Sequence, residues 1–456
     1  MSENGGRKLF GTDGIRGVAN VYPMTAEVAL SLGRAVAYVF RKKDHRHKIL
    51  IGKDTRLSGY MLEQAMASGI CSMGVDVLLV GPIPTPGIAF LTRTLRADAG
   101  AVISASHNPF QDNGIKFFAA NGFKLPDELE LEIEKLMSDN SIHSLRPTAT
   151  EIGKAFRVDD ALGRYNVFVK SAFPRQRTLD GLRIAIDCAN GSAYRVAPEV
   201  LSELGASVTA LGVDPDGENI NRDCGALHPE KLARTVVDKG CHLGVALDGD
   251  ADRAIFIDET GAVVDGDEIL TMAAADLLRH GTLAKNTVVA TVMSNLGLDL
   301  AIEGLGGRVV RAPVGDRYVV EEMLRGGYNV GGEQSGHLVF LDHTTTGDGL
   351  ITALFVMALL VEQGRPLSEL RRVMKRTPQV LLNVRVSEKR SIADLRAVQR
   401  AIRSAESRLQ RRGRVVVRYS GTETLARVMV EGDDGEVIRR LAEDIVSAFE
   451  QEVGVR

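Results

Sequence analysis

The chain has 456 residues, and at roughly 150 residues per domain this length predicts about three domains. Its 56 Lys and Arg residues against 59 Asp and Glu residues give a net charge of −3, which excludes the global basic field of a general nucleic-acid binder. Trp is absent, so a carbohydrate platform built on indole rings is excluded too. An anion site must therefore be local, and the 47 glycines predict loops in which backbone approaches a ligand.

The cysteines and the hydropathy predict a cytoplasmic location. The four cysteines are scattered without a C-x-x-C pair, so neither a disulfide framework nor a cysteine zinc site is expected. The N-terminus lacks the apolar core of a signal peptide, and the longest apolar run, residues 351–361, is too short to span a bilayer. That run predicts a buried helix, and no membrane insertion is expected. The cysteines are Cys71, Cys188, Cys224 and Cys241.

An internal repeat organises most of the chain. Residues 48–81, 183–212 and 287–315 each contain an apolar run rich in β-branched residues, a turn, a segment of helical periodicity and a second apolar run. This order is typical of a βαβ unit and predicts mixed or parallel sheets covered by helices. We therefore expect three related α/β domains. Two further helices are expected over residues 127–137 and 367–374.

The last part of the chain follows a different order and predicts a small α+β domain. Thr377-Pro378 interrupts the preceding pattern. The segments that follow are a strand over 380–386, a helix over 392–410, strands over 414–420 and 425–432, and a helix over 435–450. The expected domains are residues 1–157, 158–262, 263–375 and 376–456.

The first loop whose residues could take part in catalysis spans residues 103–118, where an apolar strand leads into Ser104, Ser106, His107 and Asn108. A hydroxyl beside an imidazole in a turn suits a serine that carries a phosphoryl group or acts as a nucleophile. An ordinary turn or cap serine explains the same residues. The G-x-S-x-G elbow of a hydrolase is missing, which disfavours acyl transfer.

The second loop places Asp248, Asp250 and Asp252 between two apolar strand-like runs. Three carboxylates so close repel one another unless a cation joins them, and oxygen-only ligands suit Mg²⁺. A calcium EF-hand is disfavoured, because Arg253 occupies the position of the required glycine and the flanks are strands. A solvated acidic turn is the alternative without a metal.

The third loop spans residues 329–340 and holds Glu333, Ser335 and His337 among glycines. A carboxylate, a hydroxyl and an imidazole on one short loop can recognise a polyol by hydrogen bonds. An ordinary β-turn explains the pattern equally well.

The fourth loop spans residues 418–427 and predicts an anion cradle. Its guanidinium, hydroxyl and amide donors match a phosphate monoester. A hairpin turn flanked by an arginine is the alternative. The donors are Arg418, Ser420, Gly421 and Thr422.

Together the loops indicate phosphosugar chemistry, and the chain resembles the α-D-phosphohexomutase superfamily over its whole length. The motifs that carry the resemblance are FGTDGIRG, GKDTRLSG, SASHNP with NGIKF, DGDADR, GEQSGH and RxSGTE, in the family's order. With Gln334, the motif GEQSGH resembles that of the branch of the superfamily that acts on glucosamine phosphates. The resemblance implies three α/β domains plus a C-terminal α+β domain in a heart-shaped arrangement, and an isomerase that interconverts glucosamine 6-phosphate and glucosamine 1-phosphate. That activity would feed UDP-N-acetylglucosamine and cell-wall synthesis.

The resemblance also implies roles for individual residues. Ser106 would be a phosphoserine that binds Mg²⁺ together with the three aspartates, and glucosamine 1,6-bisphosphate would be the bound intermediate and the activating phosphoryl donor. Lys116 is the preferred general acid/base, with a pKa expected to be lowered by arginine and Mg²⁺. Glu333 and Ser335 would contact sugar hydroxyls. Phosphate contacts or proton transfer would involve Arg16, His107, Arg253 and His337, and the distal phosphate would bind Arg418, Ser420, Gly421, Thr422 and Arg427.

Two other functions fit parts of the sequence. A phosphatase of the haloacid dehalogenase type would use Asp248 as its nucleophile, because a D-x-D follows an apolar strand. A phosphosugar sensor would bind without turnover.

In the last loop, Tyr419, Thr424 and Ala426 depart from the family pattern, which puts details of substrate affinity in doubt. The expected partners are a phosphosugar and a second copy of the chain in a homodimer, and no nucleic acid.

Overall fold

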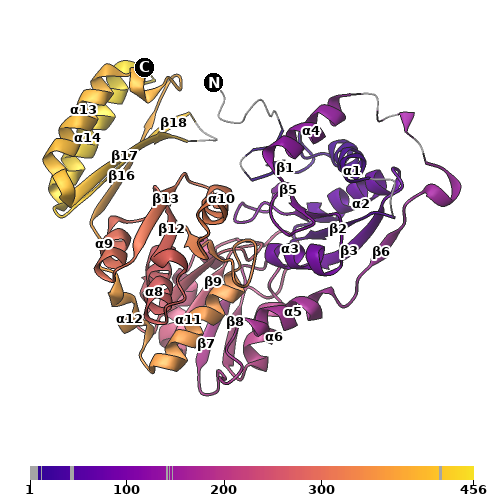
Figure 1. Ribbon diagram of the computed structural model, residues 1–456, viewed down its shortest axis with the longest axis horizontal. Coiled ribbons are helices and arrows are strands. Elements are labelled where there is room, and N and C mark those ends of the chain that lie inside the picture. Colours follow the sequence, from indigo (N-terminus) through magenta and orange to yellow (C-terminus); the bar gives the residue numbers. More distant parts are fainter. Residues whose placement is uncertain are drawn as a thin grey trace.

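The computed structural model describes residues 9–11, 13–41, 46–139, 142, 144–145, 147–420 and 424–455, and the backbone alone of Arg411. The described chain forms four sheets covered by helices. In Figure 1 the N-terminal part lies at the right, the two middle parts lie below and to the left, and the C-terminal part stands at the upper left. We call these parts domains I, II, III and IV in chain order. The α/β architecture expected from the sequence is confirmed.

Domain I contains a six-stranded mixed sheet in the order β1-β5-β4-β2-β3-β6. Strands β2, β3, β4 and β6 run parallel, whereas β5 pairs antiparallel with both β1 and β4. Its elements are β1 Ile15–Val18, α1 Ala26–Phe40, β2 Lys48–Lys53, α2 Ser58–Cys71, β3 Asp76–Pro82, α3 Thr85–Thr94, β4 Ala99–Ile103, β5 Asp112–Ala119, α4 Asp127–Ser138 and β6 Ala155–Arg157.

Domain II contains a five-stranded sheet in the order β11-β10-β9-β7-β8. Its strands β9, β7 and β8 are parallel, as the βαβ pattern predicts, and β10 turns back antiparallel to β9. The elements are α5 Ala161–Ser171, β7 Arg183–Asp187, α6 Val196–Glu203, β8 Ser207–Leu211, α7 Glu230–Lys239, β9 Leu243–Leu247, β10 Ala254–Asp258 and β11 Val263–Val264.

Domain III repeats the arrangement with four strands in the order β13-β12-β14-β15. Helix α11 is buried on most of its length, as its apolar sequence predicts. The expected helix over 367–374 is shorter, because the backbone tightens into a 3₁₀ turn at Arg371–Val373. The elements are α8 Gly266–Arg279, β12 Thr287–Thr291, α9 Leu296–Gly304, β13 Arg308–Ala312, α10 Asp316–Gly326, β14 Val330–Gly332, β15 Leu338–Phe340, α11 Gly349–Gln363 and α12 Leu367–Leu370.

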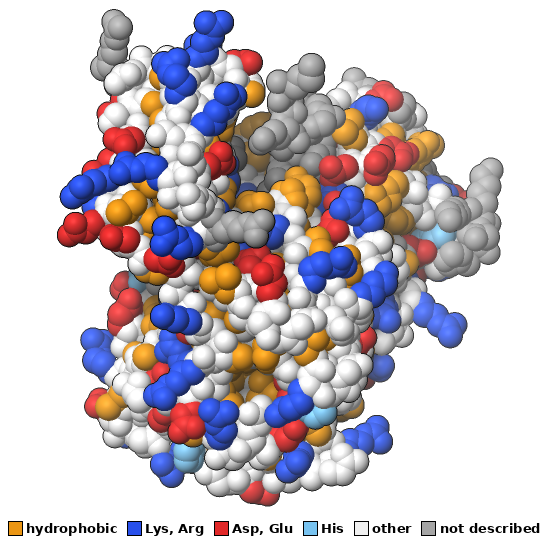
Figure 2. Space-filling view, turned by 60° about the vertical axis from the view of Figure 1, so that its left-hand side comes forward, with side chains coloured by type: hydrophobic (Ala, Val, Ile, Leu, Met, Phe, Trp, Pro, Cys, Tyr) orange, Lys and Arg blue, Asp and Glu red, His pale blue; other side chains and the backbone are white. Residues whose placement is uncertain are grey.

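Domain IV is an antiparallel sheet in the order β16-β18-β17 with two helices on one face (Figure 1). The first helix begins at Arg396, because extended backbone at Leu395 separates it from a short 3₁₀ turn over Ile392–Asp394. The domain forms a lobe at the upper left of Figure 2, with Lys and Arg side chains on its outer side. Its elements are β16 Gln379–Arg385, α13 Arg396–Leu409, β17 Gly413–Tyr419, β18 Leu425–Gly432 and α14 Gly435–Val453.

The cores show how the domains are joined. One hydrophobic cluster runs through domains I, II and III and includes Leu50, Ile184 and Val288. Domain IV has a separate cluster of its own. It meets domain III through polar contacts: Leu296 N–H donates to Glu431 Oε1 at 3.1 Å, and the Arg414 guanidinium, which pairs with Glu431 inside domain IV, donates to Ser294 O. These hydrogen bonds attach domain IV to domain III.

Asp267 on α8 gives domain III a pH-dependent stability. Burial, followed by the charge of Asp265, raises the Asp267 pKa to about 7, although Asn295 N–H donates to its Oδ2 at 2.8 Å. The folded protein therefore binds more protons than the unfolded chain between about pH 4 and pH 7, and stability falls as pH rises through this window.

We expect Asp267→Asn to stabilise the protein at pH 8 by up to about 4 kcal/mol, and by much less at pH 4.5. Unfolding in urea at both pH values measures the difference. Asp444→Asn, at an exposed position on α14, is the control and should change stability little at either pH. An Asp267→Asn gain that is equal at both pH values would contradict the assignment.

No single helix in the described ranges is long and apolar enough to cross a membrane, and one bent pair, α11 with α12 and the following 3₁₀ turn, passes that test by length and composition alone.

Candidate active site

Ser106 lies in the turn after β4 and faces the loop between β9 and β10. Its backbone is left-handed, with a φ of 52°, and the residue is only 1% exposed. The Ser106 Oγ donates to Asp248 Oδ2 at 2.6 Å and lies 3.2 Å from His107 Nδ1. The fold therefore places the serine of domain I directly on the aspartate loop of domain II, which we define as residues 248–253.

The aspartate loop forms a buried carboxylate cluster. Asp248, Asp250 and Asp252 each offer an oxygen within 4.8 Å of the others, and all three are buried. Burial raises the pKa of Asp248, and the charges of Asp252 and Asp250 raise it further. The solvated acidic turn considered from the sequence is therefore wrong.

The cluster also fits a divalent cation. Asp250 Oδ1 is buried and has no hydrogen-bond partner among the described residues. Three carboxylates that converge, one of them with an oxygen that no described residue binds, are the kind of donor set that Mg²⁺ accepts. These three residues could hold the ion beside Ser106.

Lys116 projects from the middle of β5 into the same cluster. Its Nζ lies 3.2 Å from Asp250 Oδ2, 3.2 Å from Asp13 Oδ2 and 3.9 Å from Asp252 Oδ2. The expected lowering of the Lys116 pKa is wrong for this arrangement: burial lowers the pKa, but the charges of the three carboxylates outweigh burial and hold it above its usual range. Lys116 is thus a fixed cation at neutral pH.

His107 and Arg253 lie next to each other in the site. The Arg253 Nη1 lies 3.1 Å from His107 Nδ1. Burial, followed by the charges of Arg253 and Arg16, lowers the pKa of His107 to about 4, so its imidazole is neutral at pH 7. The Arg16 guanidinium pairs with the Asp13 carboxylate.

Domain III adds His337, which the structure also brings to this cluster. Its Nδ1 lies 3.6 Å from Asp252 Oδ1 and its Nε2 lies 3.5 Å from Asp316 Oδ2. Burial lowers the His337 pKa, but Asp252 and then Asp316 outweigh it and raise the pKa to about 9. Lys124 of domain I in turn lies 2.6 Å from Asp316, so a continuous row of charges joins domains I, II and III.

Several of these partners were missed by the sequence analysis. Asp13 lies within the FGTDGIRG motif, which was a usable signal. Thr85 donates to Asp250 Oδ2 at 2.7 Å from the start of α3, and no local pattern marks it. Lys124 and Asp316 belong to no recognised motif, so only the fold reveals them.

The Glu333 loop joins β14 to β15. Glu333 Oε1 accepts a hydrogen bond from Gly315 N–H at 2.9 Å, and Ser335 Oγ donates to Glu333 Oε2 at 3.3 Å. Ser335 is exposed, so its hydroxyl is accessible. Gly336 must be glycine, because its φ is 90° and a Cβ would lie 2.3 Å from Ala254 O. The loop is a turn that presents a carboxylate and a hydroxyl.

The arginine loop joins β17 to β18 in domain IV. Arg418 and Arg427 lie directly opposite each other on the two strands. Two guanidinium groups at one position of a sheet are donors that a phosphate group can bind. Ser420, directly after β17, is buried. Gly421 and Thr422 lie outside the described residues.

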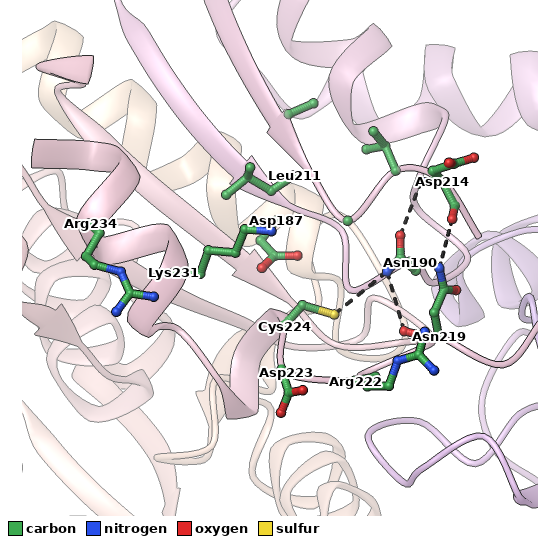
Figure 3. Close-up of a pocket in the computed structure, with 13 residues that line it drawn as sticks. Asp187, Asn190, Leu211, Asp214, Asn219, Arg222, Asp223, Cys224, Lys231 and Arg234 are labelled. Atoms are coloured by element: carbon green, nitrogen blue, oxygen red, sulfur yellow. Dashed lines mark hydrogen bonds between the residues drawn. The ribbon is translucent and has the colours of Figure 1, made fainter. Parts of the chain in front are cut away.

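A separate cavity of about 650 Å³ lies in domain II, at the carboxyl ends of β7 and β8 (Figure 3). Lys231 and Arg234 from α7 stand on one side of it, and Asn190 and Asn219 stand on the other. None of the residues that the sequence predicts for the active site lines this cavity.

Comparison with known proteins agrees with the geometry. Family models described as phosphoglucomutase/phosphomannomutase match four successive segments: α/β/α domain I over residues 7–143, domain II over 164–261, domain III over 265–377 and the C-terminal domain over 381–448.

Relatives that match over nearly the full length narrow the assignment to one family. The chain is 62% identical to a phosphoglucosamine mutase of Syntrophotalea carbinolica over 99% of both chains. It is 64% identical to a phosphoglucosamine mutase of Anaeromyxobacter sp., over 98% of this chain and 96% of that protein. The chain belongs to the phosphoglucosamine mutase family. Members of this family are enzymes, so the sensor and the aspartyl-phosphate phosphatase considered from the sequence are set aside.

Solved structures show the same fold at low identity. A phosphoglucomutase/phosphomannomutase family protein of Burkholderia thailandensis has a TM-score of 0.81 with 24% identity and covers 97% of both chains. An N-acetylphosphoglucosamine mutase of Aspergillus fumigatus, solved with GlcNAc-6P and magnesium, has a TM-score of 0.67 with 20% identity over 98% of this chain and 97% of that one.

Proposed function

We propose that this protein interconverts glucosamine 6-phosphate and glucosamine 1-phosphate through a phosphorylated Ser106. The observation that carries the proposal is the buried hydroxyl of Ser106, placed 2.6 Å from the carboxylate cluster in a chain more than 60% identical to phosphoglucosamine mutases. Phosphoryl transfer depends mainly on positioning and on charge around the transferring group, and this site supplies both.

In the first step, the bond between Ser106 Oγ and phosphorus breaks while a bond forms between phosphorus and O1 of glucosamine 6-phosphate, and Ser106 Oγ takes up the proton that O1 loses. The product is glucosamine 1,6-bisphosphate. After it turns end for end, Ser106 Oγ attacks the 6-phosphate and the bond between phosphorus and O6 breaks. O6 takes up the proton that Ser106 Oγ loses, and glucosamine 1-phosphate leaves. The enzyme is then phosphorylated again, so a trace of bisphosphate suffices to activate it.

The cations and the imidazole have separate roles in this scheme. Lys116 and Arg253 stay charged and neutralise the transferring phosphoryl oxygens, and neutral His107, 3.2 Å from Ser106 Oγ, takes the hydroxyl proton in the return step. When bound by Asp248, Asp250 and Asp252, Mg²⁺ would supply Lewis-acid polarisation of a phosphoryl oxygen.

The substrate would be held from both ends. Glu333 and Ser335 would bind sugar hydroxyls, and the arginine loop would hold the phosphate that is not reacting. Because the bisphosphate must bind in two orientations, a cradle of Arg418, Ser420 and Arg427 suits either phosphate. Gly421 and Thr422 are proposed to add donors to it. A homodimer and a cytoplasmic location remain parts of the proposal, and light scattering of the purified protein tests the dimer.

The proposal is tested by comparing kcat/KM for the 6-phosphates of glucosamine, glucose and mannose, with Mg²⁺ and a trace of the matching 1,6-bisphosphate. We expect glucosamine 6-phosphate to be preferred by at least about 10-fold, which corresponds to roughly 1.4 kcal/mol. Phosphopeptide mapping should find the phosphate on Ser106. An acyl phosphate on Asp248, or no preference for glucosamine, would reject this mechanism or this specificity respectively.

A further inference from the structure

Every backbone polar group of Ser106 is held by a side chain. Its N–H donates to Ser104 Oγ at 2.9 Å. Its carbonyl oxygen accepts hydrogen bonds from Arg56 Nη2 at 2.9 Å and from Asn221 Nδ2 at 2.8 Å. A left-handed backbone is unfavourable for serine, so these bonds hold a conformation that the residue would not adopt by itself.

Arg56 reaches this loop from the turn after β2. The residue is fully buried, and its Nε donates to Asp54 Oδ2 at 2.8 Å. Its Nη1 donates to Pro109 O at 2.5 Å, and its Nη2 donates also to Asn108 O at 2.9 Å. One planar guanidinium therefore binds three carbonyl oxygens of the loop, those of Ser106, Asn108 and Pro109, which a lysine ammonium could not do from one point.

Asn221 reaches the same carbonyl from domain II. Its Nδ2 donates to Asn108 O at 3.0 Å as well as to Ser106 O. The segment before Asn221 is held by two other asparagines (Figure 3). Asn219 Nδ2 donates to Asp214 O, Asn190 Oδ1 accepts from Asp214 N–H, and Asn190 Nδ2 donates to the backbone carbonyl of Asn219. The neighbouring contact between Thr55 Oγ1 and Asn190 O, at 2.6 Å, crosses the same domain boundary.

We propose that Arg56 and Asn221 are positioning residues for phosphoryl transfer. They donate hydrogen bonds to the Ser106 carbonyl from two domains and so fix the left-handed backbone. This backbone in turn orients Ser106 Oγ toward Asp248. The inference rests on the proposed function. Neither side chain needs to touch substrate, because an error of about 1 Å in the position of a reacting atom can lower the rate about 100-fold.

The first test is Asn221→Ala. We expect kcat for glucosamine 6-phosphate to fall by about 10- to 100-fold, with KM within about 2-fold of wild type, because the sugar-binding residues lie in other loops. Asn329→Ala is the matched control: its amide also donates two hydrogen bonds, to Thr282 O and Asp342 Oδ2, but in domain III. The control should keep the wild-type kcat even if its thermal stability falls.

The second test measures how firmly Arg56 and Asn221 hold the Ser106 loop, without an activity assay. Hydrogen exchange of the segment 104–112 should become several-fold faster in Asn221→Ala and stay unchanged in Asn329→Ala. Arg56→Lys should resemble Asn221→Ala, and guanidinium added to Arg56→Ala should restore part of its kcat.

The outcomes separate the two hypotheses. Wild-type exchange and a wild-type kcat in Asn221→Ala would overturn the positioning role of Arg56 and Asn221 without contradicting the mutase activity. A loss of kcat of the same size in Asn329→Ala would overturn that role as well. A wild-type protein without mutase activity would instead overturn the proposed function, and the exchange measurement would still decide whether the two side chains hold the loop.

Discussion

Ser106→Ala should lower the mutase rate by at least about 10³-fold, because the substitution removes the atom that carries the phosphoryl group between the two half-reactions of the proposed mechanism. The rate is measured by converting glucosamine 6-phosphate with Mg²⁺ and glucosamine 1,6-bisphosphate present. The fold should survive, since an alanine methyl fits the volume of the serine side chain. Mg²⁺ binding, measured by calorimetry, should persist because the three aspartates remain.

Ser68→Ala provides the control for Ser106→Ala. Ser68 lies on the exposed face of α2 and donates only to Gln64 O one turn earlier, so its loss should leave the rate unchanged. Residual activity of Ser106→Ala above one tenth of wild type would move the phosphoryl carrier to another residue.

Asp248→Asn should separate activity from stability. Burial and two neighbouring aspartates raise the pKa of Asp248, so the metal-free cluster is held under electrostatic repulsion. Removing one charge relieves the repulsion, and we expect Tm of the metal-free protein to rise by about 2 °C or more. The same change removes a ligand of the proposed Mg²⁺ site and should lower kcat by at least about 100-fold, or roughly 3 kcal/mol.

The raised pKa of Asp248 also predicts how the Tm gain of Asp248→Asn changes with pH. An acid whose pKa is raised on folding binds more protons in the folded state, so it weakens stability as pH rises above the unfolded value of about 3.9. The Tm gain of Asp248→Asn should therefore grow between pH 5 and pH 8. Differential scanning calorimetry in EDTA measures it. Excess Mg²⁺ should reverse the order, because only the wild type gains stability from the ion.

Asp160→Asn is the control for Asp248→Asn. Asp160 is exposed and pairs with Arg164 one turn along α5, so its replacement should change neither kcat nor the effect of Mg²⁺. A metal-free Asp248→Asn protein less stable than wild type would show that the Ser106 hydrogen bond outweighs the repulsion in the cluster.

The local motifs made much of the fold and site predictable. The βαβ periodicities located β2, β7 and β12, and the change of order after Thr377 located domain IV. Ser106 and the three aspartates stand in short segments whose residue types already suggest their chemistry. For such features the sequence neighbours and the spatial neighbours are the same residues, so a linear reading suffices.

The failure over Lys116 has a different origin. Its expected pKa depended on which charges surround the amine, and these come from Asp13 on one side of domain I and from Asp250 and Asp252 in domain II. The same is true of the row from Lys124 to Asp316 and His337, which crosses from domain I to domain III.

By itself, the sequence determined the domain order, the family and the residue types of each loop, because periodicity and motifs are written within a few dozen residues. Only the tertiary structure decided which charges meet, which carboxylates are buried together and which side chains grip Ser106. Electrostatic energy depends on distance and burial, and contacts such as that between Ser106 and Asp248 join residues 142 positions apart, so no local pattern encodes them.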